Sequence, residues 1–259
     1  MKILGIIPAR MASSRFPGKP MKKIHGIPMI GHCYLRSIMS KSLEECYVAT
    51  PDKEIFDYIN SINGKVVMTS DKHEMCNERV FEAVDNIENS TNNKKFDIIV
   101  NIQGDLPMIF PSMIDNLIEP LLKNKEVTNT TMVDEITNSD DFLDRNRVKV
   151  LMTQNNDAIL FTREPVPSQF KYKEQFKKFK HVAIRAYRRD VFNQIKKLSI
   201  TPIEKIEAID DLRLIENGIQ IRITFTKELT ETVDTPEDLT KVINMMDDDK
   251  LISQYSINR

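Results

Sequence analysis

The first half of the sequence alternates between short apolar runs and amphipathic segments, and this alternation constrains the fold more than any other feature. Apolar runs of strand length occupy residues 3–9, 46–50, 65–70 and 96–102. Apolar side chains recur at helical spacing in residues 29–40, 53–62, 77–87 and 111–122. Strands that alternate with helices indicate a mostly parallel sheet with helices on both faces. In such sheets, ligands bind beyond the carboxyl ends of the strands.

The middle of the chain has a different pattern, with little helix between its expected strands. These strands are predicted at residues 127–136, 148–154, 157–163 and 181–189. This succession favours an antiparallel extension of the sheet. The basic residues 168–180 within it are interpreted as a mobile surface loop rather than a lid over a site.

The last part of the chain is predicted to contain two helices and a strand. Residues 203–217 are expected to form one amphipathic helix that ends at Gly218, and residues 219–226 a strand. The final helix, over residues 235–246, has Thr235 as its N-cap and Pro236 in its first turn. The charged residues after it are expected to fray.

The composition limits the class of partner. The chain has 259 residues, with 37 Lys and Arg against 38 Asp and Glu, so a general nucleic-acid-binding surface is not indicated. Three cysteines without a CxxC spacing argue against a disulfide framework or a structural zinc site. The sequence lacks a signal-peptide pattern and an apolar stretch of membrane-spanning length. We therefore expect a cytoplasmic protein that binds neither nucleic acid nor membrane.

The clearest candidate for an anion site follows the first strand, in IIPARMASSRFPGKP, residues 6–20. Arg10 offers a planar fork for phosphate oxygens and Lys19 a mobile point charge, while Gly18 permits a close approach of the backbone. The loop is neither a Walker A loop nor a GxGxxG loop. Its cations follow a buried strand at the ligand-binding end of the sheet, which favours an anion site over a solvated turn.

Two aspartates are candidates for a metal site. Asp105 follows an apolar strand through Gly104 in NIQGDLP. An acid there can hold a hard divalent cation between phosphate oxygens, and a plain turn aspartate is the alternative. Asp234 precedes the last helix, where it could instead serve the helix cap or dipole. The metal hypothesis for Asp234 requires the two carboxylates to converge.

These motifs occur together in the order of one family. IIPARMASSRFPGKP, VNIQGDLPMI, ILFTREPVP, HVAIRAYRR and VDTPEDL resemble segments of the 3-deoxy-manno-octulosonate (Kdo) cytidylyltransferases, over roughly residues 2–245. The resemblance implies an α/β fold with a Rossmann-like, mostly parallel sheet of the nucleotidyltransferase type and an antiparallel extension. It implies one domain over residues 1–247 and a tail over 248–259. The expected parts are a CTP-binding part (about 1–125), an acceptor-binding and dimerisation part (about 126–230) and a C-terminal helix (235–247).

The resemblance also implies a reaction and its residues. CMP would pass from CTP to the anomeric hydroxyl of Kdo or a related acidic sugar in a homodimer, with Mg²⁺ as cofactor and pyrophosphate as the second product. Arg10, Lys19, Asp105 and Asp234 would be catalytic, and the two aspartates would bind Mg²⁺. The implied CTP contacts are Pro8, Ala9, Arg10, Ser13, Ser14, Lys19, Arg79, Gln103 and Gly104. The implied acceptor contacts are Arg163, His181, Arg185, Asp210, Asp211, Met75 and Asn77.

The sequence departs from the family pattern on the acceptor side. Residues 73–79 are HEMCNER where the family has a small, glycine-containing turn. Arg185 stands where the family has a tyrosine, and Asp210 and Asp211 replace a Glu-Gln pair. Either drift compensated by neighbours or a changed acceptor explains these departures. With a changed acceptor, Arg185 would hold a carboxylate or phosphonate and Asp211 an ammonium or hydroxyl group.

The alternatives to Kdo are therefore acceptors of the same chemistry, such as 8-amino-Kdo, another nonulosonic-type acid or a phosphonate. An alternative from another class is a non-catalytic CTP-binding protein. Retention of both Asp105 and Asp234 argues against it, because a protein that only binds CTP does not need a metal to organise a nucleophile.

Overall fold

The computed structural model describes all residues of the chain except 14, 74, 92–93, 169–175 and 257–259. Contacts within the chain define two compact units, which we call unit 1 (Met1–Asp115 with Glu228–Arg259) and unit 2 (Asn116–Lys227). Most of the segment 168–180, interpreted above as a loop, lies outside the described residues. No helix in the described part of the chain combines the length and apolarity needed to cross a membrane.

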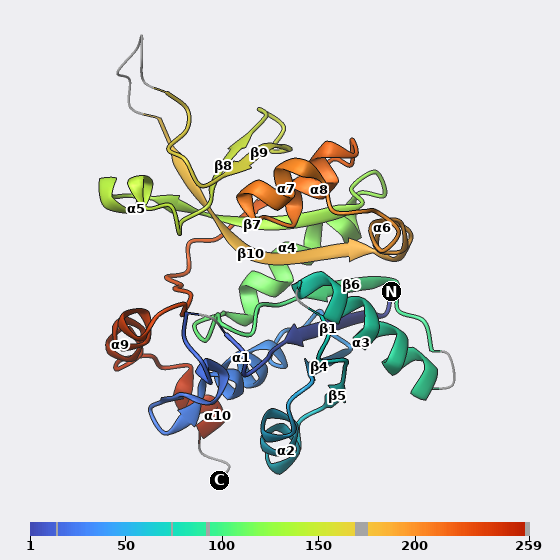
Figure 1. The fold of residues 1–259 in the computed structure, drawn as a ribbon, viewed down its shortest axis with the longest axis vertical. Coiled ribbons are helices and arrows are strands. Elements are labelled where there is room, and N and C mark those ends of the chain that lie inside the picture. The colour runs from blue at the N-terminus through green and yellow to red at the C-terminus, as the bar shows by residue number, and fades with distance from the viewer. Residues whose placement is uncertain (14, 74, 92–93, 169–175, 257–259) are drawn as a thin grey trace. The chain divides into compact units, whose positions relative to one another are not determined.

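Unit 1 has a sheet of four parallel strands among its described residues, in the order β6-β1-β4-β5 (Figure 1). The strands are β1 (Ile3–Pro8), β4 (Glu45–Thr50), β5 (Val66–Met68) and β6 (Ile98–Asn101). In β1, Leu4, Ile6 and Ile7 are fully buried, because a strand covered on both faces needs apolar side chains on both. The predicted parallel arrangement is confirmed.

Helices connect these strands as the sequence predicts. They are α1 (Met29–Ser37), α2 (Lys53–Ser61), α3 (Cys76–Ser90) and α4 (Pro111–Lys123), the last containing the boundary between the units. A short turn and a hairpin lead into α1: η1 (Lys19–Met21), β2 (Lys23–Ile24) and β3 (Ile27–Pro28). Gly18, with φ of 71°, adopts the left-handed conformation that starts η1 and sets the direction of Lys19.

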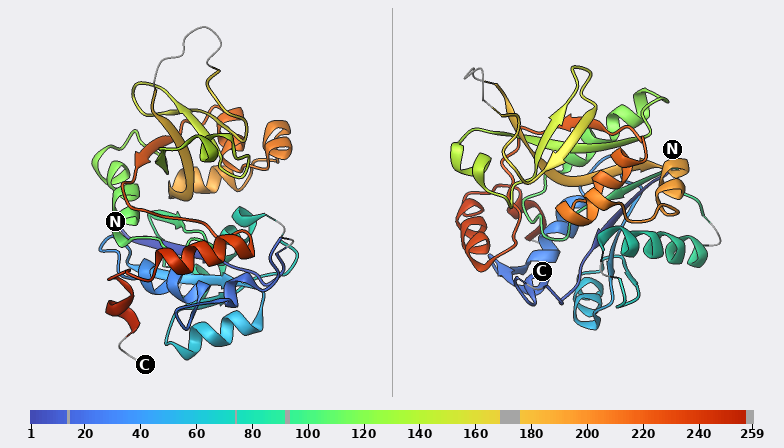
Figure 2. Two further views of the ribbon diagram at one scale, coloured as in Figure 1. Left: turned by 90° about the vertical axis from the view of Figure 1, so that its left-hand side faces the viewer. Right: turned by 45° about the horizontal axis from the view of Figure 1, so that its top comes forward.

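The C-terminal residues return to unit 1, where they pack on its N-terminal elements (Figures 1 and 2). They form α9 (Pro236–Met245) and α10 (Ile252–Ser256). Val233, Val242 and Met246 join an apolar cluster with Ile24 and Met29. The expectation that the chain frays after Asp247 is wrong for residues up to 256, because Ile252–Ser256 form α10.

The physical reason is a buried guanidinium on α1. Arg36 has no exposed side-chain surface and forms an ion pair with Asp249. Its Nε–H donates to the Tyr255 hydroxyl at 3.0 Å. His32 donates from Nε2 to the Ile24 carbonyl, so its Nδ1 accepts from the Tyr255 hydroxyl at 2.7 Å. A buried charge needs partners, and the C-terminal segment supplies them.

Unit 2 is built on a mainly antiparallel arrangement of strands. They are β7 (Asn129–Ile136), β8 (Lys149–Met152), β9 (Ala158–Thr162), β10 (Lys178–Arg188) and β11 (Arg222–Phe225). β10 pairs antiparallel with β7 and β8, β9 pairs antiparallel with β8, and β11 runs parallel to β7. The predicted antiparallel extension is confirmed.

The helices of unit 2 differ from the prediction. They are α5 (Ser139–Leu143), α6 (Arg189–Ile195), α7 (Pro202–Glu207) and α8 (Asp211–Glu216). One continuous helix over 203–217 is wrong, because Ala208 takes the left-handed conformation (φ 53°) between α7 and α8. The two helices are joined by an ion pair between Arg213 and Glu204, both buried. Gly218, with φ of 72°, ends α8 as predicted.

Candidate active site

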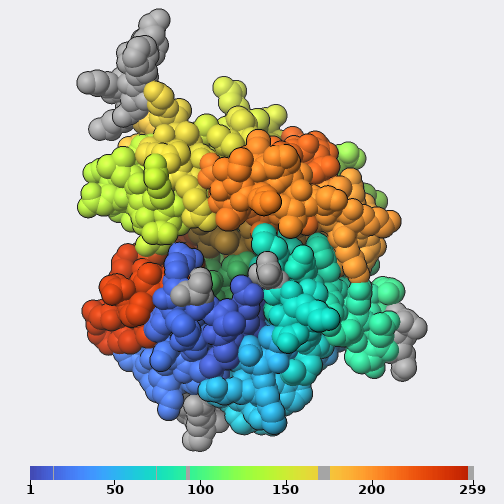
Figure 3. All heavy atoms as spheres, viewed as in Figure 1, coloured from blue at the N-terminus to red at the C-terminus, as the bar shows by residue number. Residues whose placement is uncertain are grey.

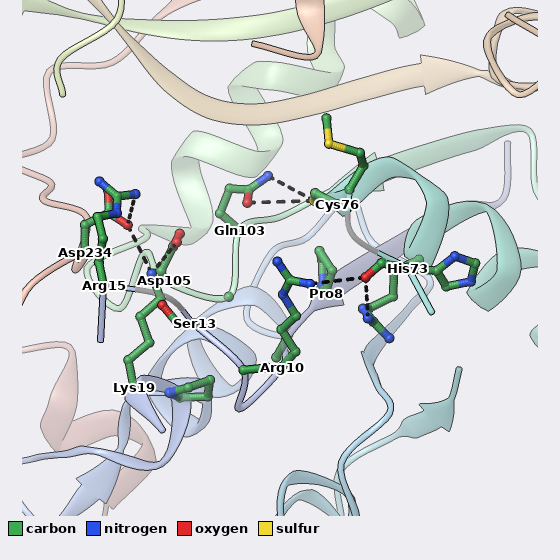
Figure 4. A pocket seen from close by; sticks show the side chains of 16 residues that line it. Pro8, Arg10, Ser13, Arg15, Lys19, His73, Cys76, Gln103, Asp105 and Asp234 are labelled. Carbon is green, nitrogen blue, oxygen red and sulfur yellow. Dashed lines mark hydrogen bonds and ion pairs between the residues drawn. The ribbon is translucent and has the colours of Figure 1, made fainter. Parts of the chain in front are cut away.

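A cavity of about 290 Å³ lies in unit 1 at the carboxyl ends of β1 and β6. The sequence-predicted residues that line it are Pro8, Ala9, Arg10, Ser13, Lys19, Met75, Arg79, Gln103, Gly104, Asp105 and Asp234 (Figure 4). Ser14 lies outside the described residues. The position agrees with the rule for parallel sheets, and it brings together residues 8 to 234 of the chain.

Lys19 lies between Asp105 and Asp234 in this cavity (Figure 4). Its Nζ lies 2.9 Å from Asp105 Oδ2, 3.2 Å from Asp234 Oδ1 and 2.8 Å from the Val233 carbonyl oxygen. Only 12% of its side-chain surface is exposed. Burial by itself lowers the pKa of Lys19, but attraction to Asp105 and Asp234 outweighs burial and raises it. Lys19 is therefore a charged group that holds the two carboxylates together.

The backbone holds the same two segments in place. The Val233 N–H donates to the Asp105 carbonyl at 2.9 Å, so the residue before Asp234 is tied to Asp105 itself. The cap of α9 is made by Thr235 and Asp238, whose side chains bond to each other's backbone N–H groups. Thus the Asp234 carboxylate does not cap this helix and points instead to Lys19.

The two carboxylates offer the donor chemistry of a magnesium site. Their oxygens converge on one cation, and hard divalent cations prefer carboxylate oxygens. In the part of the chain that the structure describes, no group of three or more His, Cys, Asp or Glu forms a complete metal cluster. A metal bound between Asp105 and Asp234 would take its remaining ligands from phosphate oxygens or water.

Gly104 is required by the close approach of two strands. A Cβ at this position would lie 2.5 Å from the carbonyl oxygen of Pro8, inside the contact distance of any real side chain. The glycine therefore lets the end of β6 lie against the end of β1. Gln103 and Asp105, on either side of it, reach the cavity because of this turn.

Arg10 and Arg79 also line the cavity, and Figure 4 shows Arg10 next to His73 and away from the Asp105–Asp234 pair. Arg10 is exposed, and its Nη1 donates to the His73 carbonyl at 3.2 Å. Arg79 is buried and donates to Thr69 Oγ1 at 2.6 Å and to the carbonyls of Ser70 and His73. Burial, as the larger cause, and repulsion from Arg10, as the second, lower the pKa of Arg79. Arg10 can reach a ligand, whereas Arg79 orders the loop beside it.

Met75, Cys76 and Asn77, which stand where the family has a small turn, belong to unit 1. Met75 and Cys76 line the cavity, and the Cys76 thiol lies 3.6 Å from Gln103 Nε2. Asn77 is buried and accepts a hydrogen bond from Asn101 at 3.2 Å. The other predicted acceptor residues belong to unit 2. A single acceptor pocket that joins both groups stays a prediction.

In unit 2, Arg185 and Asp211 bind each other. The guanidinium Nε and Nη2 donate to the two carboxylate oxygens at 2.8 and 2.5 Å. Arg185 is 5% exposed and Asp211 2% exposed. Burial opposes both charges, but mutual attraction raises the pKa of Arg185 and lowers that of Asp211. The sequence suggested separate roles, an anion clamp and a donor-binding acid, but here each group neutralises the other.

Two other cationic candidates in unit 2 are also engaged with protein atoms. Arg163 donates to the backbone carbonyls of Glu207 at 2.7 Å and Arg145 at 3.0 Å. His181 is bonded through Nε2 to Thr131 Oγ1 at 2.7 Å, and burial lowers its pKa to about 4. The imidazole is therefore neutral near pH 7.

Asp210 differs from its neighbours. Its side chain is 8% exposed, yet among the described residues no side-chain hydrogen bond to its carboxylate is found. Burial raises the pKa of Asp210 in spite of the nearby Arg185. A ligand with a donor group can therefore hydrogen-bond to this carboxylate.

Two groups that contact Asp234 or Lys19 in the cavity are absent from the predicted site residues. Arg15 Nη2 lies 3.0 Å from Asp234 Oδ1. Its position in the same loop as Arg10 and Lys19 was the signal that could have identified it. The Val233 carbonyl, the third acceptor of Lys19, has no signal in the sequence because any residue supplies a carbonyl.

Unit 1 has the features of a nucleotidyltransferase: a parallel sheet whose carboxyl edge combines cations for phosphates with two converging carboxylates. The chain matches the family model described as cytidylyltransferase over residues 4–228. A 3-deoxy-manno-octulosonate cytidylyltransferase from Geobacter metallireducens is 38% identical over 257 residues, covering 95% of this chain and 98% of that protein. One from Leptospira interrogans is 39% identical over 253 residues, covering 98% and 99%.

Solved structures agree with these matches. A CMP:2-keto-3-deoxy-manno-octonic acid synthetase complexed with CTP has a TM-score of 0.85 and 34% identity, covering 95% of this chain and 98% of its own. A cytidylyltransferase from Leptospira borgpetersenii, at 17% identity and a TM-score of 0.60, supports the fold alone. The chain is a cytidylyltransferase and belongs to the 3-deoxy-manno-octulosonate cytidylyltransferase family.

Proposed function

We propose that the chain transfers CMP from CTP to the anomeric hydroxyl of Kdo or a closely related acidic sugar. The oxygen of this hydroxyl attacks the α-phosphorus, the bond from that phosphorus to the bridging α–β oxygen breaks, and pyrophosphate leaves. The hydroxyl proton passes to water. The observation that carries the proposal is the convergence of Asp105 and Asp234 on Lys19 in the cavity of unit 1.

Each residue of the cavity has a role in this reaction. Arg10 and Lys19 would bind the triphosphate, with Arg10 as a fork and Lys19 as a point charge. Asp105 and Asp234 would hold Mg²⁺, which would neutralise charge on the triphosphate and orient the attacking oxygen. Gln103, beside Asp105, would contact the nucleotide. No covalent intermediate with the protein is required for a direct in-line displacement.

We base the proposed acceptor on which charged groups of unit 2 are paired within the protein and which are not. Because Arg185 is neutralised by Asp211, a phosphonate held by Arg185 alone is disfavoured. Asp210 is the buried acid that lacks a hydrogen-bonding donor among the described residues. An acceptor with a hydroxyl or ammonium group facing Asp210 satisfies it, and an ammonium group would do so more strongly. The second candidate is therefore an amino-substituted Kdo or another nonulosonic-type acid.

A pyrophosphate-release assay with CTP and Mg²⁺ tests the proposal. The panel should contain Kdo, 8-amino-Kdo, a nonulosonic acid and a phosphonate. Release that requires one of the sugar acids and stops in EDTA supports the proposal. If none of these acceptors gives pyrophosphate release, the proposal is rejected. Greater kcat/KM for an amino acceptor, lost in Asp210→Asn, would identify the second candidate. The proposed homodimer and cytoplasmic location are tested by sedimentation velocity and by cell fractionation.

A further inference from the structure

In unit 1, the cations expected to bind the triphosphate are bonded to the carboxylates expected to bind the metal. Lys19 meets Asp105, Asp234 and the Val233 carbonyl within 3.2 Å. An ammonium group has three N–H donors, so these three acceptors satisfy it completely. Arg15 lies against the same oxygen of Asp234, at 3.0 Å. The protein thus supplies its own positive charge at the point where the carboxylates converge.

A divalent cation and Lys19 would compete for the same oxygens. Mg²⁺ bonds carboxylate oxygens at about 2.0–2.1 Å and demands its own octahedral shell. An ammonium that remains hydrogen-bonded to Asp105 Oδ2 and Asp234 Oδ1 occupies that shell. Lys19 has a long, rotatable stem, so it can leave these oxygens without a change in the backbone. The ammonium then needs new acceptors, because only 12% of the side chain reaches solvent.

We propose that Lys19 is an internal counter-ion, which holds the two carboxylates until a divalent cation and the triphosphate together replace it. This inference rests on the proposed function. The cation takes over the carboxylates, and phosphate oxygens become the new acceptors of Lys19. The cation alone binds weakly, because it must displace an ammonium whose hydrogen bonds are satisfied. The triphosphate alone also binds weakly, because drawing Lys19 away leaves the two carboxylates without a compensating charge. The two ligands therefore strengthen each other's binding to the same degree.

Manganese binding without nucleotide or acceptor isolates the first half of this exchange. Mn²⁺ can be titrated into the full chain and followed by electron paramagnetic resonance of the free ion. In the wild type, Lys19 should keep binding to the cavity weak. Lys19→Met removes the competitor and should tighten binding by about ten- to a hundredfold, the range expected for losing a hydrogen-bonded charge.

Three variants make the result specific. Lys23→Met removes the same charge from an exposed position on β2 and should leave Mn²⁺ binding at the wild-type level. Lys19→Met combined with Asp105→Asn should lose the gained affinity, because the carboxylate is then missing. Lys19→Gln removes the charge with a shorter, polar side chain and serves if Lys19→Met does not fold.

Equal Mn²⁺ affinity in the wild type and both Lys19 variants would overturn the inference. So would an equal gain in Lys23→Met, which would reflect net charge alone. Failure of the proposed function is seen separately, as absence of CTP-dependent pyrophosphate release by the wild type with every acceptor. That result would leave the manganese titration interpretable, because the titration contains no substrate.

Discussion

The ion pair between Arg36 and Asp249 allows a direct test of how the C-terminal segment is held in unit 1. The change is Asp249→Asn, which removes the negative charge and keeps the size of the side chain. Arg36 has no exposed side-chain surface, and 8% of the Asp249 side chain is exposed. The variant would leave a guanidinium buried with the Tyr255 hydroxyl and the rings of Phe110 and Tyr255 as its neighbours.

The expected loss follows from this burial. Removing one partner of a buried ion pair costs about 3–5 kcal/mol, because the other charge is left without compensation. The asparagine oxygen can still accept one hydrogen bond, and Tyr255 still accepts from Arg36 Nε. We therefore take the lower end, about 3 kcal/mol. At about 2–4 °C per kcal/mol for a chain of this size, Tm should fall by about 6–12 °C.

Thermal unfolding followed by circular dichroism measures this shift. Asp248→Asn is the matched control, because it removes the same charge from the neighbouring, exposed residue. It should change Tm by no more than about 2 °C, which corresponds to the usual effect of a surface substitution. If Asp249→Asn lowers Tm no more than Asp248→Asn does, the C-terminal segment does not neutralise Arg36 and the reasoning is refuted.

Three further predictions concern charge in the two units. Lys19→Ala should lose about 2–4 kcal/mol of transition-state stabilisation, measured as kcat/KM for CTP, and an unchanged value would remove Lys19 from the site. Burial lowers the pKa of His32 and of His181 to about 4. Unfolded histidine binds a proton near pH 6.5, so the free energy of unfolding should fall from pH 6.5 to pH 4, and a flat profile would contradict their burial. Arg185→Met should destabilise the protein by about 3–5 kcal/mol in urea denaturation, and adding Asp211→Leu should recover most of this; no recovery would mean that the two side chains are not an ion pair.

The elements of unit 1 were predictable because their signals are local. Strand and helix periodicities recur within windows of ten or so residues, and buried strands such as β1 are apolar throughout. The break at Ala208 was not predictable in this way. Neither glycine nor proline marks it, and the ion pair of Arg213 with Glu204 that joins α7 to α8 depends on tertiary structure. Helix α6 was missed for a similar reason, since it follows β10 directly at Arg189.

The cavity was predictable to the extent that its motifs are specific. Lys19, Asp105 and Asp234 were named from the sequence, although 215 residues separate the first from the last. Their mutual contacts were not foreseen, because the sequence does not show which charges meet in the absence of a ligand. The pairing of Arg185 with Asp211 had an overlooked signal. Arg185 and Asp211 both depart from the family pattern and carry opposite charges. Such a pair is expected when one side chain neutralises the charge of the other.

The return of the chain to unit 1 affects how the protein is made. Asp234 and the apolar residues Val242 and Met246 leave the ribosome after the whole of unit 2. Figure 3 shows the C-terminal segment (red) beside N-terminal residues (blue) on the surface of unit 1. Synthesis of residues 116–227, at about 5–20 residues per second, takes on the order of ten seconds. During this interval the cavity of unit 1 lacks the Asp234 carboxylate, and the apolar residues around Ile24 lack the cover that Val242 and Met246 provide. The cavity is therefore completed late, and exposed apolar surface is available to chaperones in the meantime.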